Sequence, residues 1–106
     1  MTNDRIGILV AGLLIPLPGF GDAQLEAGRK VFMEQAQPSC AVCHTLSDAG
    51  ATGVVGPNLD ELAPSVEQVQ RAVTSGVGIM PPFGESLSED QIAAVAHYVS
   101  TVTAAK

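Results

Sequence analysis

The stretch Cys40-Ala41-Val42-Cys43-His44 decides the fold of this 106-residue chain, because it gathers the chain's most reactive side chains. Its two cysteines are the only cysteines of the sequence, and they stand three positions apart. Three residues span almost one helical turn, so both thiols are expected on the same side of a helix. The spacing C-x-x-C-H is the signature of covalent c-type haem attachment, in which the thiols bind the two vinyl groups and the histidine binds the iron.

Three other chemistries use paired cysteines, and the sequence argues against each of them. A thioredoxin-like redox pair belongs to a strand–helix–strand unit, for which the sequence has no pattern. A structural zinc site needs four ligands, and beyond the motif only His97 remains as a nitrogen or sulfur ligand of the usual kind. A disulfide between Cys40 and Cys43 is compatible with export but closes a very small loop. Haem attachment is therefore the preferred interpretation.

Met80 is the candidate for the second ligand of the iron. It lies in the segment 76–84, where Gly76 and Gly78 allow the backbone to approach a flat group and two prolines stiffen the chain. A thioether on the second axial position raises the haem potential and closes the iron to other ligands. A methionine in such a constrained loop is better explained as a ligand than as a core side chain.

Two other side chains compete with Met80 for this role. Met33 follows Phe32 in a predicted helix, where filling the hydrophobic core is the expected role of a methionine. His97 lies about 140° around the axis of the last predicted helix from Ile92, and it is expected to face solvent. A bis-histidine site is therefore the lesser alternative.

Apolar residues recur at helical spacing in three segments, which predict helices over residues 24–35, 66–75 and 89–104. The second and third helices each begin with a capping box, in which a serine is followed three residues later by a glutamine. These pairs are Ser65 with Gln68 and Ser88 with Gln91. No alternating strand pattern with hairpin turns is present, so the predicted fold class is all-α.

The beginning of the chain has the pattern of a cleaved signal peptide over residues 1–23. An apolar run over residues 6–17 ends at a proline-rich stretch, and small residues follow at a suitable cleavage position. The run is shorter than the roughly 20 residues of a membrane span, so no span is expected after cleavage. Residues 24–106 then form one small domain with few aromatic side chains, which a cofactor would complete.

The formal net charge is −6, and the sequence contains no cluster of lysine and arginine residues. Nucleic acid and anionic membranes are therefore excluded as partners, because both require a basic surface. An acidic protein of this kind is expected to dock on a basic patch of its partner.

Together these residues resemble the class I mono-haem cytochromes c over residues 25–102. The resemblance implies an all-α cytochrome c fold, with three main helices around one covalently bound haem and crossed N- and C-terminal helices. It implies that Gly28 lets these helices approach and that the Pro57 carbonyl accepts a hydrogen bond from His44 Nδ1. The family pattern stands here as Gly28 with Phe32, the CxxCH motif, Gly56-Pro57-Asn58-Leu59, Met80-Pro81, and Val95 with Tyr98.

Within this class, the chain is similar to the small photosynthetic cytochromes and to the cytochrome subunits or electron acceptors of periplasmic sulfite dehydrogenases. The resemblance implies a periplasmic single-electron carrier, not an enzyme, with one haem c attached through two thioethers to Cys40 and Cys43. His44 and Met80 would bind the iron, and Pro57 would support His44. The electron donor would be a periplasmic dehydrogenase such as a sulfite dehydrogenase, and the acceptor a terminal oxidase or a second carrier.

Two alternatives to a diffusing carrier stay open at this point. The chain could be a tightly bound haem subunit of a dehydrogenase complex, or an open-site haem enzyme or gas sensor if Met80 does not bind the iron. For the carrier, an apolar docking rim is expected around the haem edge. The residues expected to form it are Ala41, Val42, Ile79, Pro81 and Pro82.

Overall fold

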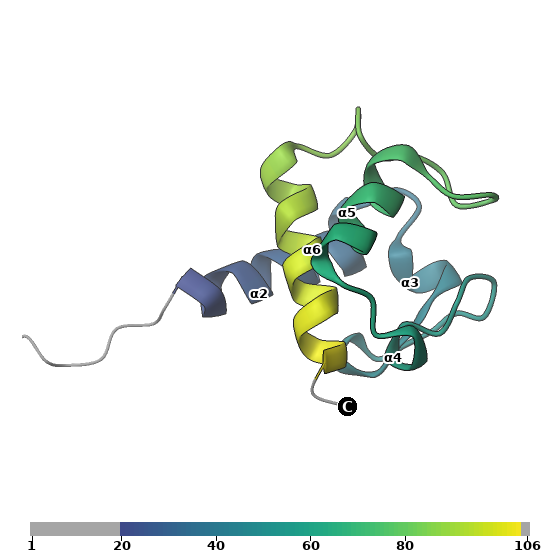
Figure 1. Ribbon diagram of the computed structural model, residues 1–106, viewed down its shortest axis with the longest axis horizontal. Helices are drawn as coiled ribbons and strands as arrows, with labels where there is room; N and C mark the ends of the chain where they lie inside the picture. The colour runs from purple at the N-terminus through teal and green to yellow at the C-terminus, as the bar shows by residue number, and fades with distance from the viewer. Residues whose placement is uncertain (1–19, 105–106) are drawn as a thin grey trace, which may run out of the picture.

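Three long helices frame the structure, a computed structural model that describes residues 20–104 (Figure 1). Helix α2 (Phe20–Lys30) continues into a π-helical turn, η1 (Val31–Gln35), and the other long helices are α5 (Val66–Ser75) and α6 (Glu89–Ala104). Between them lie five short elements: α3 (Cys40–Cys43), β1 (Thr45–Leu46), the 3₁₀ turn η2 (Ser47–Ala49), β2 (Ala51–Thr52) and α4 (Leu59–Leu62). Within the described residues, no helix has both the length and the apolar character that crossing a membrane requires.

The crossing of α2 and α6 is the central contact of the fold (Figure 1). A Cβ atom at Gly28 would overlap the Ala94 carbonyl oxygen and the Tyr98 Cβ, so only glycine allows this approach. Beside the contact, the rings of Phe32 and Tyr98 pack edge to face, at a centroid distance of 6.2 Å and with 64° between their planes. Such a pair adds about 1 kcal/mol beyond the burial of its surface. The expected crossing at Gly28 is confirmed.

The hydrophobic core lies where α5 and the crossed helices meet, and it extends to the short strands. Valine, isoleucine and leucine supply most of it, and Phe32 and Phe83 are its phenylalanines. The most deeply buried large side chains are those of Val31, Phe32, Leu46, Val95, Tyr98 and Thr103.

The predicted helices 66–75 and 89–104 are confirmed with their bounds, and so are both capping boxes. In each box the serine hydroxyl accepts from the glutamine N–H, and the glutamine side chain accepts from the serine N–H, at distances between 2.8 and 3.1 Å. Each box satisfies two backbone donors at the start of a helix. Local sequence was therefore sufficient to locate these helix starts.

The first predicted helix, 24–35, ends where expected but differs in two respects. Its last turn is π-helical over Val31–Gln35, and the helix already begins at Phe20. The predicted cleavage position after Ala23 therefore falls inside α2. Residues 1–19, which make up most of the predicted signal peptide, lie outside the described residues.

A small antiparallel hairpin follows the CxxCH motif and was not predicted. Thr45 pairs with Thr52 and Leu46 with Ala51, and the turn between the strands ends at Gly50, whose φ of 65° suits glycine. Two-residue strands are too short to display an alternating pattern, so the sequence offered no signal for them. The hairpin reverses the direction of the chain after His44, so that the following segment returns to the region around this residue.

Tyr98 ties this hairpin to the helix crossing. Its hydroxyl donates a hydrogen bond of 2.7 Å to Asp48 Oδ2 in η2, and Arg29 Nη1 of α2 lies 3.8 Å from the same oxygen. Burial, and after it the Asp48 carboxylate, raises the pKa of Tyr98 well above its usual value near 10. The neutral hydroxyl is therefore the form that the fold stabilises.

Replacing Tyr98 with phenylalanine tests this link. We expect Tyr98→Phe to lower the free energy of unfolding by about 1 kcal/mol at pH 7, because one hydrogen bond to a partly exposed carboxylate is lost. Above about pH 10 the tyrosine ionises in the unfolded state before it ionises in the folded state, which destabilises the wild type alone. The difference should therefore shrink between pH 9 and 11 in denaturant titrations of the holoprotein. A difference that stays constant up to pH 11 would contradict the raised pKa.

Candidate haem site

Helix α3 presents the two cysteines from a single helical turn. Ser39 caps this turn, because its Oγ accepts from the Ala41 N–H at 3.2 Å and donates to the Phe32 carbonyl at 3.0 Å. The serine thus joins α3 to the end of the first helix. Cys40 and Cys43 are both free thiols and are both half-buried, and Cys40 packs against the core. The arrangement holds two reactive sulfur atoms at helical spacing on a short, anchored element.

The electrostatics of Cys40 argue against a redox-active cysteine pair. Burial raises the pKa of the Cys40 thiol to about 11, so it is protonated at neutral pH. A thioredoxin-like pair depends on the opposite shift, since its nucleophilic cysteine has a lowered pKa. A protonated thiol has the proton that is needed for addition of S–H across a vinyl double bond.

His44 directly follows α3, and its ring is held by the chain itself. Its Nδ1 lies 2.8 Å from the Pro57 carbonyl oxygen. Because a carbonyl can only accept, Nδ1 carries the proton and Nε2 keeps the lone pair that binds a metal. This hydrogen bond is the one that the family resemblance implied. The half-buried imidazole is therefore oriented as a metal ligand by the protein alone.

Gly56 makes this arrangement sterically possible. A Cβ atom at Gly56 would lie 2.6 Å from the His44 Cε1, and the Gly56 N–H donates to the Cys43 carbonyl at 2.7 Å. Gly53 packs as closely, since its Cβ would lie 2.7 Å from the His44 backbone nitrogen. The family pattern included Gly56 but not Gly53. The only sequence feature that could have pointed to Gly53 was its position three residues before Gly56.

Met80 lies in a loop with little freedom to move. Val77 and Met80 exchange two backbone hydrogen bonds, of 3.1 and 2.8 Å, around a two-residue turn. Gly76, with a φ of 76°, is needed because a Cβ there would lie 2.7 Å from the Met80 carbonyl oxygen. After the prolines, the Phe83 N–H donates to the Val73 carbonyl at the end of α5, at 2.7 Å. The half-buried Met80 side chain packs against the core.

Large aliphatic side chains are exposed around the segments that carry His44 and Met80. They come from α3, the segment 53–57 and the loop 76–80, which lie on the same side of the molecule (Figure 1). Their exposed fractions run from 61% to 85%, and such a concentration of apolar surface normally marks a binding site. The residues are Val42, Val54, Val55, Val77 and Ile79. Two thiols, an imidazole Nε2, a thioether and an apolar surround fit a c-type haem.

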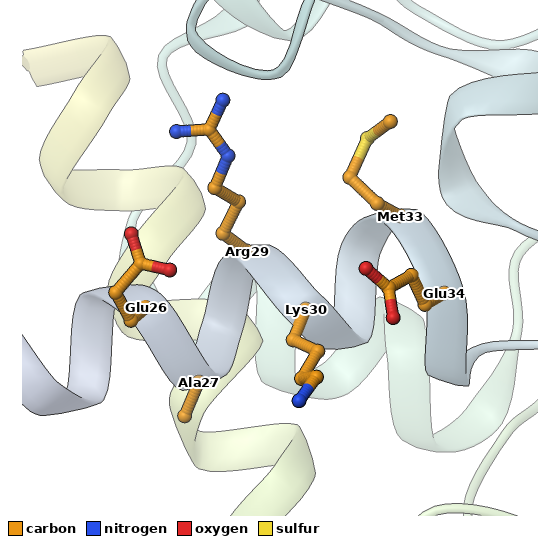
Figure 2. Close-up of a pocket in the computed structure, with 6 residues that line it drawn as sticks. All are labelled: Glu26, Ala27, Arg29, Lys30, Met33 and Glu34. Atoms are coloured by element: carbon orange, nitrogen blue, oxygen red, sulfur yellow. The ribbon is translucent and has the colours of Figure 1, made fainter.

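The expectation that Met33 fills the core is wrong. Its side chain is 37% exposed and lines a hollow on the outer side of α2 and η1, where it projects on the same side as Arg29 (Figure 2). Met33 follows the buried Phe32 in η1, and one residue turns a helix by roughly a quarter of a turn, which takes the side chain off the buried face. The hollow contains none of the predicted haem-binding residues and is also lined by Glu26, Ala27, Lys30 and Glu34.

His97 is half-buried on α6, whereas the sequence predicted a solvent-facing side chain. It stands between Ala96 and Tyr98, which are both buried, so it lies at the border of the buried face of α6. Within residues 20–104, no three His, Cys, Asp or Glu side chains gather in a group that could hold a metal ion.

Comparisons with known proteins agree with this geometry. The family described as "Cytochrome C oxidase, cbb3-type, subunit III" matches residues 23–99. The chain is 37% identical over 81 residues to cytochrome c6 of Leptolyngbya boryana, covering 73% of this chain and 91% of that protein. It also resembles the crystal structure of the c-type cytochrome SorU from Sinorhizobium meliloti, with 55% identity and a TM-score of 0.75. That match covers 77% of this chain and 93% of the other.

The fold and the site thus define a small class I cytochrome c, as the sequence resemblance implied. The chain belongs to the family described as cbb3-type cytochrome c oxidase subunit III, whose model covers residues 23–99. Members of the cytochrome c family carry covalently attached c-type haem, and Cys40 and Cys43 stand at the required spacing. The protein is an electron carrier, and the two relatives named above are likewise c-type cytochromes.

Covalent attachment is tested by removing both thiols. We expect the Cys40→Ala, Cys43→Ala double variant, expressed in a host that matures c-type haem, to contain no covalently bound haem. The two thiols are the only groups of the chain that can form thioethers. Mass spectrometry of the denatured protein measures the attached mass directly, and the Ser47→Ala variant serves as a control with both thiols intact. Haem that stays attached to the double variant would contradict the assignment.

Proposed function

We propose that the protein is a periplasmic single-electron carrier whose haem iron is bound by His44 and Met80. The observation that carries the proposal is the hydrogen bond from His44 Nδ1 to Pro57, which leaves Nε2 available as a ligand. The constrained loop that presents Met80 supports it from the other side. If His44 and Met80 both held the iron, it would be closed to exogenous ligands and substrates, and the haem would supply electron transfer alone.

The residues around the site keep its geometry constant. When bound, a c-type haem supplies an iron that takes up and releases one electron. Pro57 and Gly56 hold the His44 ring, and the bonds from Val77 and Phe83 hold the Met80 loop against α5. Ligands that stay in place in both oxidation states keep the reorganisation energy small. The methionine thioether favours the reduced iron and so raises the potential.

The signal-peptide pattern supports export, and the family resemblance supports a dehydrogenase as the partner. Residues 1–23 would be removed as a signal peptide, and the periplasm is the compartment where the carrier would act. The similarity to cytochromes that serve sulfite dehydrogenases supports such a dehydrogenase as the electron donor. A terminal oxidase or a second carrier would accept the electron.

The docking face proposed here is the apolar surface around α3 and the Met80 loop. Val42, Ile79, Pro81 and Pro82 of the predicted rim are exposed, whereas Ala41 is half-buried and packs against the core. The segments 38–64 and 76–84, which surround this face, contain three acidic residues and no lysine or arginine. A partner with an apolar contact surface and a basic rim is complementary to this charge distribution.

Ionic strength tests this docking. We expect the rate of electron transfer from a sulfite dehydrogenase of the same organism to fall by roughly tenfold between low and high salt, because screening removes the attraction of opposite charges. Stopped-flow reduction of the cytochrome measures this rate. A rate that is independent of salt would contradict electrostatic docking and favour the alternative of a tightly bound haem subunit.

An optical spectrum tests the axial ligands. We expect the ferric holoprotein to show the weak long-wavelength band of methionine sulfur on ferric haem. This band should disappear in Met80→Ala and persist in Met33→Ala, because the exposed Met33 is a methionine outside the site. A high-spin spectrum of the wild type would instead indicate an open iron, and the protein would then be a haem enzyme or a gas sensor.

A further inference from the structure

The segment 53–57 forms a clasp over the end of α3, and three hydrogen bonds close it. The Thr45 hydroxyl donates to the Gly53 carbonyl at 2.8 Å, and the Gly56 N–H donates to the Cys43 carbonyl at 2.7 Å. The third is the bond of 2.8 Å from His44 Nδ1 to the Pro57 carbonyl. The Thr45 bond lies at one end of the clasp and the His44 bond at the other.

The Thr45 hydroxyl holds the Gly53 end of the clasp, and Thr45 is not among the residues that we propose to bind haem or iron. Gly53 itself offers no side chain, and its backbone already packs against the Cys43 carbonyl carbon, to which an added Cβ would approach within 2.6 Å. The Gly53 carbonyl oxygen has a half-buried hydroxyl as its partner. Without this partner the carbonyl must find solvent, which pulls the clasp away from α3.

The position of the clasp sets the strength of the bond between His44 and Pro57. A hydrogen bond accepted from the second ring nitrogen makes a histidine ligand more basic, and a more basic ligand stabilises the oxidised metal. The bond weakens if the Pro57 carbonyl moves by a few tenths of an ångström from its distance of 2.8 Å. The midpoint potential then rises because the ferric state loses stabilisation.

We propose that Thr45 is a positioning residue that holds down the midpoint potential by keeping the Pro57 carbonyl on His44 Nδ1. This inference rests on the proposed ligation of the iron by His44. The hydroxyl of Thr45 donates to the Gly53 carbonyl, and through this bond Thr45 acts on the clasp. Its backbone also pairs with Thr52 in the hairpin, a role that does not depend on the hydroxyl.

Thr45→Val tests the proposal, because it removes the hydroxyl and keeps the shape of the side chain. We expect covalent haem and the methionine band to be retained, and the midpoint potential to rise. We also expect the His44 Nδ1 proton, observed by NMR in the reduced holoprotein, to exchange with solvent about fivefold faster, as the loss of one ordinary hydrogen bond predicts. Thr45→Ser, which restores a hydroxyl, should return both values to those of the wild type.

Thr52→Val is the matched control, since Thr52 stands opposite Thr45 in the hairpin and is exposed. It should leave the potential and the proton exchange unchanged. If Thr45→Val does not mature, Thr45→Ala removes the same hydroxyl with less bulk and carries the same expectation.

The proposal is overturned if neither hydroxyl-deficient Thr45 variant changes the potential and the exchange rate, or if Thr52→Val changes them equally. The spectrum of the wild type decides separately whether His44 and Met80 bind the iron. A wild type with the methionine band and an unchanged Thr45→Val potential therefore contradicts this inference alone.

Discussion

The close approach of α2 and α6 at Gly28 is the constraint on which the rest of the structure depends. Because no side chain separates the helices there, the rings of Phe32 and Tyr98 meet and close the core beside the crossing. The same Tyr98 reaches Asp48 with its hydroxyl and so holds the hairpin that follows His44. Packing at one helix crossing thus extends to the segment that follows His44, the proposed iron ligand.

The residues that we propose to bind the haem lie on short and irregular segments. Helix α3 is a single turn, and both the clasp over residues 53–57 and the Met80 loop lack regular secondary structure. Their rigidity comes from hydrogen bonds to neighbouring elements and from glycines that permit close contacts at Gly56 and Gly76. Such backbone contacts suit an electron carrier, because its ligands should not move when the charge of the iron changes.

Charge and apolar surface have separate roles in the proposed docking. The net charge, −6 over the full sequence and −5 over residues 24–106, acts over distances of about a Debye length and brings a basic partner close. The exposed aliphatic side chains around α3 and the Met80 loop act only at contact. Since these segments carry no lysine or arginine, the face differs in chemistry from the outer side of α2, where Arg29 and Lys30 lie.

The sequence by itself determined the features that depend on neighbouring residues along the chain. The CxxCH spacing, the two capping boxes and the helices 66–75 and 89–104 are local patterns. The structure bears out both helices and both boxes. Met33 shows the limit of such patterns, because helical spacing places residues around an axis but does not say how far the neighbouring elements cover them. Only the tertiary structure placed Met33 at the surface and shielded part of His97.

The contacts between segments that are far apart in the sequence were likewise decided only by the tertiary structure. Tyr98 and Asp48 are separated by 50 residues, and no local pattern marks either of them as a partner of the other. The bonds that join Thr45 to Gly53 and His44 to Pro57 depend on how the chain returns over α3. A family pattern could indicate the bond between His44 and Pro57. The bond between Thr45 and Gly53 arises from packing and backbone geometry, which residue types and spacing do not specify.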